Sequence, residues 1–363
     1  MSITSIAQPT ARPDVLVTGG CGFLGSNIAD KLAADGRQVR ILDSMERVGS
    51  RENAEWLKAR HGDRVLIERA DVRDAQAVRA AVENAAAIMH LAGQVAVTTS
   101  LQEPLQDFEI NVGGTLNVLE AVRCHNPGAP VIFASTNKVY GRLLHDANLR
   151  RTEGRYALAN ERFSSGVAES TPLDFYSPYG CSKGAADQYV RDYARVFGLR
   201  TVVLRMSCIY GPRQFGTEDQ GWIAHFLIQA MRGRAITIYG DGYQVRDTLY
   251  VDDAVKAWIK ALDQIDRVAG RVFNLGGGAT NTVSLRELLG LMSTLRGGRP
   301  VVRFADWRPG DQPWYVSDIR AISAALDWAP ATAVMNGLRS LERWLEARFS
   351  NSTPSIPLEQ VRA

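Results

Sequence analysis

A glycine-rich turn between a short apolar run and a helical pattern constrains the fold of this chain more than any other feature. Residues 14–18 are typical of a buried strand, Thr18-Gly-Gly-Cys-Gly-Phe-Leu-Gly25 follows, and residues 22–35 predict a helix. Gly19, Gly22 and Gly25 allow a tight turn, a close approach to a pyrophosphate and close packing of the helix on a sheet. The helix N-terminus would offer that pyrophosphate unpaired N–H groups and a positive dipole end. The turn therefore predicts a dinucleotide site at the edge of a parallel sheet.

Strands and helices alternate through the first half of the chain, which predicts the fold class. The order favours an α/β fold of Rossmann type, a doubly wound parallel sheet with right-handed crossovers, joined to a smaller mixed α/β substrate-binding lobe. Further strands are expected at 38–43, 65–69, 87–91, 131–135 and 201–205, and helices notably over 73–84 and 105–125. We expect the dinucleotide-binding domain at 1–208, with 246–275 returning to it, the substrate lobe at 209–245 and 276–345, and a flexible tail at 346–363.

Composition argues against several classes of protein. The 363 residues carry a net charge of +3, which gives no case for nucleic acid or an anionic membrane as a partner. The four cysteines show no CxxC spacing and no histidine cluster, so neither disulfides nor a metal site is expected. No apolar leader and no run of about 18 apolar residues is present, so a cytoplasmic protein is the default expectation.

An acidic residue at the end of the second predicted strand bears on the choice of cofactor. Asp43 stands 18 residues after Gly25, where a carboxylate can accept hydrogen bonds from the adenine ribose hydroxyls. Its charge would repel a 2′-phosphate, which favours NAD over NADP, although Arg47 nearby leaves NADP open. Asp71 would bond the adenine amine, whereas Asn111 is expected to form a local structural hydrogen bond.

A tyrosine and a lysine four residues apart indicate the chemistry. In a helix, Tyr179 and Lys183 share a face, and an ammonium beside the phenol would lower a pKa that is about 10 in water. Such a phenol could remove a proton from a sugar hydroxyl near neutral pH. The spacing alone is a weak signal, because ordinary amphipathic helices carry it by chance. Thr136, at the end of a predicted strand, would stand at the same edge of the sheet and complete a catalytic set.

Several longer strings make the chain resemble the extended short-chain dehydrogenase/reductase family, in its nucleotide-sugar-modifying branch. With the glycine turn they cover about residues 14–345, and they are His90-Leu-Ala-Gly93, Ser135-Thr-Asn-Lys-Val-Tyr-Gly141, Ser177-Pro-Tyr-Gly-Cys-Ser-Lys183 and Gln244-Val-Arg-Asp247. The resemblance implies that Tyr179 is the acid/base and that Thr136 bonds the reacting sugar hydroxyl. It also implies that Lys183 holds the nicotinamide ribose. The expected cofactor residues are Gly19, Gly22, Phe23, Leu24, Gly25, Asp43, Asp71, Val72, Leu91, Ala92, Gly93, Tyr179 and Lys183.

Two residues beside Thr136 favour epimerisation over dehydration. In the family that the chain resembles, sugar 4,6-dehydratases carry an Asp-Glu pair at the positions of Asn137 and Lys138. That pair protonates and deprotonates the sugar to expel water, which an amide and an ammonium cannot do. Both residues could instead merely cap a strand. The long strings, such as residues 173–189, resemble most the epimerases that invert C2 of CDP-linked dideoxysugars. Departures are Arg142, where an acid is frequent, and a divergent insert at 142–172 that we expect over the sugar.

Inversion of a carbon that bears only a hydroxyl requires a transient ketone, so oxidation at C2 itself is the economical route. A nucleotide-diphosphate sugar needs cations, since arginine forks match phosphate oxygens. The expected substrate residues are Arg213, Arg246 and Arg308 for the diphosphate and Gln94, Lys138 and Gln214 for the sugar or base, with Trp222 or Trp307 stacking on the base unless they are core residues.

Two alternative functions stay open at this point. One is an NAD-dependent epimerase that acts at C4 or on a UDP- or GDP-hexose, and another is a non-catalytic nucleotide-binding homologue. The resemblance also implies a homo-oligomer that packs through helices at 105–125 and 179–197. A surface-polysaccharide pathway would fit a deoxysugar.

Overall fold

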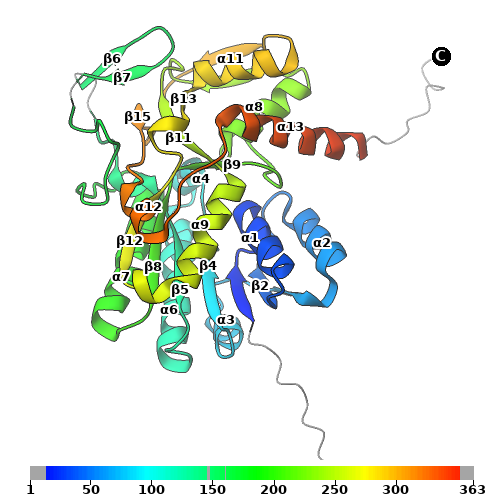
Figure 1. The fold of residues 1–363 in the computed structure, drawn as a ribbon, viewed down its shortest axis with the longest axis vertical. Helices are drawn as coiled ribbons and strands as arrows, with labels where there is room; N and C mark the ends of the chain where they lie inside the picture. Colours follow the sequence, from blue (N-terminus) through cyan, green and yellow to red (C-terminus); the bar gives the residue numbers. More distant parts are fainter. Residues whose placement is uncertain (1–13, 145–147, 160, 352–363) are drawn as a thin grey trace, which may run out of the picture.

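A seven-stranded parallel sheet forms the centre of the molecule, as seen in a computed structural model that describes residues 14–144, 148–159 and 161–351 (Figure 1). The strand order is β12-β8-β5-β4-β1-β2-β3, and every neighbouring pair is parallel. The order reverses between β1 and β4, which is where ligands of such sheets bind. The strands are β1 (Val15–Thr18), β2 (Val39–Asp43), β3 (Val65–Arg69), β4 (Ala87–His90), β5 (Val131–Thr136), β8 (Thr201–Met206) and β12 (Arg271–Leu275).

Helices cover both faces of this sheet and bury two separate apolar cores. On β1, Val15 and Val17 face one core while Leu16 between them faces the other, as the two-residue period of a strand requires. The first core is closed by α1 (Phe23–Ala34), α2 (Ser50–His61) and α9 (Val251–Asp263), and the second by α3 (Ala75–Val82), α6 (Gly114–His125) and α7 (Pro178–Phe197). The predicted doubly wound α/β fold is therefore confirmed.

Smaller sheets and their helices form an upper lobe in Figure 1. In one sheet β11 (Val245–Tyr250) pairs with β9 (Cys208–Tyr210), β13 (Thr282–Ser284) and β15 (Trp314–Tyr315), and in another β10 (Ile236–Tyr239) pairs with β14 (Val302–Ala305). The helices here are α8 (Trp222–Met231), α11 (Leu285–Arg296) and α13 (Val334–Asn351), whereas α12 (Arg320–Leu326) packs against β12 and α9. We keep the division at 208, 245 and 275 as a proposal for the domain boundaries.

Short elements connect these layers. They are α4 (Val97–Gln102), α5 (Pro104–Phe108) and α10 (Ile265–Val268), the 3-10 turns η1 (Gly62–Arg64), η3 (Asn137–Tyr140) and η5 (Ala279–Asn281), and a hairpin of β6 (Leu149–Arg151) and β7 (Tyr156–Leu158). The segment 105–125, predicted as helical, is helical throughout, although it is not one regular α-helix. α5 ends at Phe108, a π-helix η2 (Glu109–Gly113) follows, and α6 begins at Gly114. A side chain at Gly114 would overlap Val72, which explains why the third segment begins on a glycine.

The expected flexible tail is partly wrong, because α13 continues through residues 346–351. Arg348 pairs with Glu52 of α2 at 3.0 Å, and Phe349 packs against the first core. These contacts tie the end of α13 to the sheet lobe. The remainder of the predicted tail, residues 352–363, lies outside the described residues.

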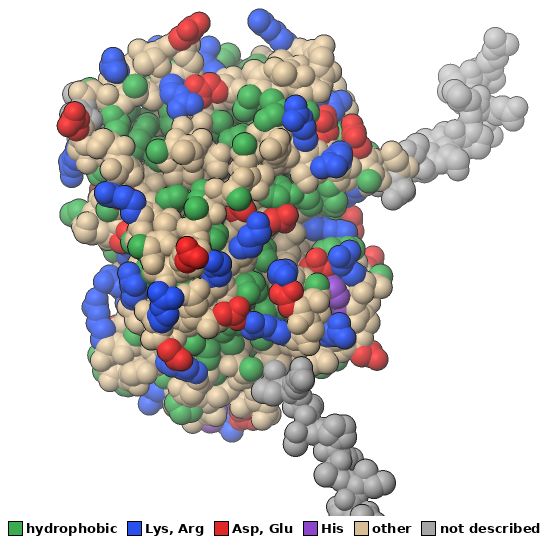
Figure 2. Space-filling view, viewed as in Figure 1, with side chains coloured by type: hydrophobic (Ala, Val, Ile, Leu, Met, Phe, Trp, Pro, Cys, Tyr) green, Lys and Arg blue, Asp and Glu red, His purple; other side chains and the backbone are tan. Residues whose placement is uncertain are grey.

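The surface and the apolar segments add two findings. On the face shown in Figure 2, Lys and Arg side chains are interspersed with Asp and Glu, and this face carries no continuous basic patch. Within the described ranges, no helix has the length and hydrophobicity needed to span a membrane. The same ranges hold no group of three or more His, Cys, Asp or Glu side chains suited to a metal ion.

Candidate active site

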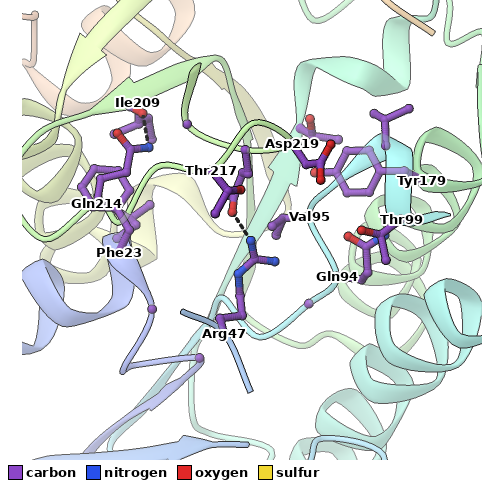
Figure 3. Close-up of a pocket in the computed structure, with 18 of the residues that line it drawn as sticks. Phe23, Arg47, Gln94, Val95, Thr99, Tyr179, Ile209, Gln214, Thr217 and Asp219 are labelled. Atoms are coloured by element: carbon purple, nitrogen blue, oxygen red, sulfur yellow. Dashed lines mark hydrogen bonds between the residues drawn. The ribbon is translucent and has the colours of Figure 1, made fainter. Parts of the chain in front are cut away.

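One cavity of about 820 Å³ lies between the carboxyl edge of the large sheet and the smaller lobe. Every cofactor, catalytic and substrate residue expected from the sequence lines it. Figure 3 shows the Tyr179 ring pointing into this space with Gln94 and Thr99 on its side, and Phe23 and Gln214 on the opposite side. Trp222 lines the cavity as well, whereas Trp307 does not and is 44% exposed.

The insert at 142–172 was expected over the sugar, and this expectation is wrong for its described residues, none of which lines the cavity. The β6–β7 hairpin packs on the far side of the upper lobe instead (Figure 1). Arg155 pairs with Glu287 of α11, and the Tyr156 hydroxyl donates to Asp241 at 2.6 Å. Such contacts join residues more than 80 positions apart, so no local pattern in the sequence announces them.

The glycine turn is shaped to receive a dinucleotide. Gly19 has a φ of 70°, and a Cβ there would lie 2.7 Å from the backbone nitrogen of Ala92. A Cβ at Gly25 would collide with the carbonyl oxygen of Gly19, so α1 can pack this closely only without a side chain. No side chain caps the N-terminus of α1 at Gly22, which leaves its first N–H groups for a pyrophosphate. These features fit NAD.

Asp43 is held by the same turn. Its carboxylate accepts the backbone N–H groups of Cys21 at 2.9 Å and Met45 at 2.8 Å, one on each oxygen. Because it is only 8% exposed, burial raises its pKa from the ordinary aspartate value, and the backbone hydrogen bonds oppose that rise. Each oxygen keeps a further lone pair, which suits bonds from two ribose hydroxyls. The neighbouring Arg47 reaches into the cavity and donates to Gln220 of the upper lobe (Figure 3).

Asp71 has a strong partner of its own. Arg73 donates hydrogen bonds to it from Nε and Nη2, and the shortest, from Nη2 to Oδ2, is 2.6 Å. These hydrogen bonds lower the pKa of Asp71. The carboxylate therefore stays ionised at the cavity wall. To bind the adenine amine, the carboxylate would have to accept this hydrogen bond in addition to those from Arg73.

Tyr179, Lys183 and Thr136 meet at the start of α7. Ser177 caps this helix by accepting the Gly180 N–H at 3.2 Å, and Pro178 occupies the first turn, so the helix begins directly before Tyr179. Thr136 ends β5, and its side chain favours the ionised form of the Tyr179 phenol and so lowers its pKa. All three side chains are nearly buried, with exposed fractions of 7%, 4% and 7% for Tyr179, Lys183 and Thr136. The structure therefore brings the predicted catalytic set together.

The electrostatics of this set differ from the sequence-based expectation. Burial and, less strongly, the charge of Asp107 raise the pKa of Tyr179 to about 12, against the opposing effects of Thr136 and Arg47. Burial also lowers the pKa of Lys183 to about 8. The Lys183 ammonium lies over the Phe133 ring at 4.3 Å and is not among the groups that lower the tyrosine pKa. The expectation of a lowered pKa for this phenol is therefore not met, because desolvation outweighs the groups that favour its ionised form.

Three cations of the substrate region are already paired with acids. Arg246 donates to Asp311 at 2.5 Å, and the Lys138 ammonium lies 3.8 Å from the same carboxylate while donating to the Gly310 carbonyl. Arg308 lies 3.7 Å over the Tyr239 ring and pairs with Glu218 at 3.5 Å. The sequence reasoning missed these acids, although the turn Arg308-Pro-Gly-Asp311 places one of them close to an expected phosphate ligand.

The other expected substrate residues are engaged within the protein. The Arg213 guanidinium lies 3.9 Å over the Trp56 ring and also near Trp344, so it packs α2 against α13. Gln94 closes a local turn by bonding the N–H and carbonyl of Ala96. Gln214 donates to the Ile209 carbonyl at 3.2 Å, while its buried amide oxygen has no partner among the described atoms. Of these three, Gln214 alone offers the cavity a vacant acceptor.

Comparison with known proteins gives a consistent family. The model of the NAD dependent epimerase/dehydratase family matches residues 15–276. The chain is 43% identical over 339 residues to CDP-paratose 2-epimerase of Salmonella typhi, covering 91% of this chain and 98% of that protein. It is 32% identical to dTDP-glucose 4,6-dehydratase of Streptomyces griseus, covering 96% and 99%. Among solved structures it resembles UDP-glucose 4-epimerase of Thermus thermophilus in complex with NAD, at 32% identity, a TM-score of 0.77 and coverage of 92% and 99%.

Proposed function

Because the chain belongs to the NAD dependent epimerase/dehydratase family, we propose that it interconverts CDP-paratose and CDP-tyvelose by transient oxidation at C2 of the sugar. The broader activity, that of an NAD-dependent nucleotide-sugar epimerase, is supported by the family model and by the epimerases among the relatives. The narrower one is supported by the similarity to the Salmonella typhi enzyme over nearly the whole chain.

The observation that carries the proposal is the pair of residues beside Thr136. Asn137 and Lys138 both line the cavity next to the catalytic set, and neither carries a carboxylate. Asn137 donates to Gln312 at 3.4 Å, and Lys138 is held by the Gly310 carbonyl. An amide and an ammonium in these places cannot form the acid pair that expels water from a sugar. This favours a reaction in which a proton is removed and later returned to the same oxygen.

The residues of this chain have separable parts in that reaction. When bound, NAD would supply the hydride acceptor and donor for the carbon that bears the hydroxyl, and its oxidised ring would carry a positive charge. Tyr179 takes the proton of the C2 hydroxyl and gives it back. Thr136 donates a hydrogen bond to the oxygen on which charge develops, and Lys183 bonds the ribose and supplies a second positive charge. The charge of the oxidised ring, together with Arg47, would oppose the burial that raises the pKa of Tyr179 to about 12.

Binding of the diphosphate would exchange one set of ion pairs for another. Arg246 and Arg308 are our assigned phosphate ligands, and both are paired with carboxylates on loops of the upper lobe. Phosphate oxygens would replace Asp311 and Glu218 on these guanidiniums. We keep the assignments of Lys138 and Gln214 to the sugar or base as part of the proposal.

The test offers the purified chain CDP-tyvelose and follows the appearance of CDP-paratose. Substrate deuterated at C2 should give product that retains the deuterium, because the hydride stays on bound NAD between the two transfers. Incorporation of solvent deuterium at C2 would instead show proton exchange and refute direct oxidation. Activity on UDP-glucose with no turnover of CDP-tyvelose would favour a C4-epimerase, as would be expected from the Thermus thermophilus neighbour.

We further propose that the enzyme is a cytoplasmic homo-oligomer that acts in polysaccharide biosynthesis. Apolar side chains are exposed along α5 and α7, including Leu105 at 69%, Phe108 at 53% and Val196 at 62%. These helices are the ones expected to pair between subunits. Light scattering on the purified protein would test this, and a mass equal to one chain at micromolar concentration would reject it.

A further inference from the structure

A buried carboxylate that the proposed reaction does not use lies beside the catalytic lysine. Asp107, on α5, is only 1% exposed. It accepts hydrogen bonds from the Ser182 hydroxyl and from the Asn111 amide, the latter at 3.2 Å. The Asn111 amide also donates to Ser182 at 3.0 Å. Burial raises the pKa of Asp107, and the hydrogen bonds from Ser182 and Asn111 and the charge of Lys183 oppose that rise and favour the ionised form.

A π-turn directly after α5 carries Asn111, one of the two side chains that donate to this carboxylate. The extra residue in η2 (Glu109–Gly113) interrupts the helix between Asp107 and α6, and Asn111 lies in the middle of it. Turns of this kind are rare and occur frequently at functional sites. Asn111 points back, so that its amide oxygen accepts the Gln94 N–H at 3.0 Å beside Gly93. A Cβ on Gly93 would lie 2.8 Å from that oxygen and 3.7 Å from the Lys183 ammonium nitrogen, so the two groups are neighbours.

We propose that Asp107 is a positioning residue, the fixed counter-ion that keeps Lys183 protonated beside the cofactor. The link to catalysis rests on the proposed function, but the electrostatic claim does not. Ser182 and Asn111 hold the carboxylate in place, and Ser182 directly precedes the lysine on α7. A buried ammonium with no compensating charge would lose its proton.

The other charged groups around Lys183 do not replace Asp107. Asp187 also favours the ammonium, but a bidentate pair with Arg205 at 2.9 Å offsets its charge. His90 faces the lysine from β4 and is neutral, because burial lowers its pKa to about 3. On the tyrosine side, Arg47 is the cation that acts on Tyr179. The pKa of Lys183, lowered to about 8 by burial, would therefore fall further without Asp107.

The experiment measures the pKa of Lys183 directly. The chain has six lysines, so NMR of the full protein with its bound NAD, labelled with ¹³C at lysine Cε, gives few signals, and Lys183→Arg identifies the one from Lys183. In Asp107→Asn we expect the pKa of Lys183 to fall by about one unit or more. Glu109→Gln is the matched control, because it removes an exposed carboxylate two residues away that lies 3.7 Å from Arg73. It should leave the lysine signal unchanged.

The pH dependence of kcat provides a second readout. Loss of Asp107 lowers the pKa of Lys183 and that of Tyr179, so both limbs of the profile should move to lower pH. Asp107→Ser serves if the Asn variant does not fold, because it also removes the charge and keeps a partner for Ser182. An unchanged Lys183 titration in a folded variant would overturn the inference. A shifted titration without epimerase activity in the wild type would instead refute only the proposed function.

Discussion

The buried ion pair between Arg205 and Asp187 is predicted to fix the position of the tyrosine helix. Arg205 comes from β8 and Asp187 from α7, and their side chains are 2% and 0% exposed. Two parallel hydrogen bonds of 2.9 Å join them. The Ser135 hydroxyl donates to Asp187 at 2.7 Å, and Arg205 also donates to the Tyr140 hydroxyl. The network thus ties the helix of Tyr179 to the strand that ends in Thr136.

Removal of one partner leaves the other charge buried and unpaired. For Asp187→Ala we expect a loss of about 3–5 kcal/mol in the free energy of unfolding, the usual range for breaking a buried pair. This is a large share of the roughly 5–15 kcal/mol by which natural domains are stable. The double variant Asp187→Leu/Arg205→Met removes both charges, so it should recover at least half of the loss. Arg79→Met, which breaks an exposed pair with Glu83, should barely move the unfolding midpoint.

Urea unfolding followed by fluorescence of the seven tryptophans measures these differences. A loss below about 1 kcal/mol for Asp187→Ala would refute the reasoning, because a solvated pair behaves in that way. So would a double variant as unstable as the single one, since the penalty would then come from lost packing and not from an unpaired charge. A variant stable enough to assay should also show a lower pKa for Lys183, because Asp187 supports the ammonium.

Three further predictions concern the base, the cofactor and acid stability. Tyr179→Phe should lower kcat by about 10²–10⁴-fold while the NAD released on denaturation, measured by mass spectrometry, stays the same. Asp43→Ser should reduce that bound NAD and reduce the preference over NADP, since its carboxylate is lost; unchanged NAD content would argue against the assigned ribose contact. Below about pH 6.5 the unfolded chain binds a proton that the buried His90 ring, with a pKa of about 3, does not. As the pH falls from about 6.5 towards about 3, the free energy of unfolding should therefore decrease by about 1.4 kcal/mol per pH unit through this group. In His90→Gln, the urea midpoint should lack this part of its pH dependence.

Local patterns were sufficient to predict the fold and the walls of the cavity. The strand at 65–69 has the predicted bounds, and most other strands of the large sheet differ by one residue at an end. The hydrophobic periodicity of strands and helices, and the glycines of a turn, involve neighbouring residues only. They can therefore be recognised without knowledge of the fold. Because the carboxyl ends of parallel strands share one edge, residues such as Thr136 and Asp43 could be placed in one site.

The partners of the site residues could not be predicted in the same way. Arg213 stacks on Trp56, and Arg246 bonds Asp311. Both pairs join segments that are distant in sequence. The π-turn at η2 has no distinctive period, and it carries Asn111, which we expected only to make a local hydrogen bond. The pKa of Tyr179 was misjudged for a related reason, because desolvation depends on the whole cavity and not on one residue four positions away.

The charges of the cavity imply that substrate binding is an exchange of counter-ions. Lys138 and Arg246 share the single carboxylate of Asp311, and Arg308 is paired with Glu218. A diphosphate that enters must displace these acids, and part of its attraction to the arginines offsets their release. The net affinity then depends on the whole nucleotide sugar filling the cavity, because a free diphosphate would gain little over the carboxylates. An enzyme that must hold a transient ketone without releasing it benefits from binding that depends on the complete substrate.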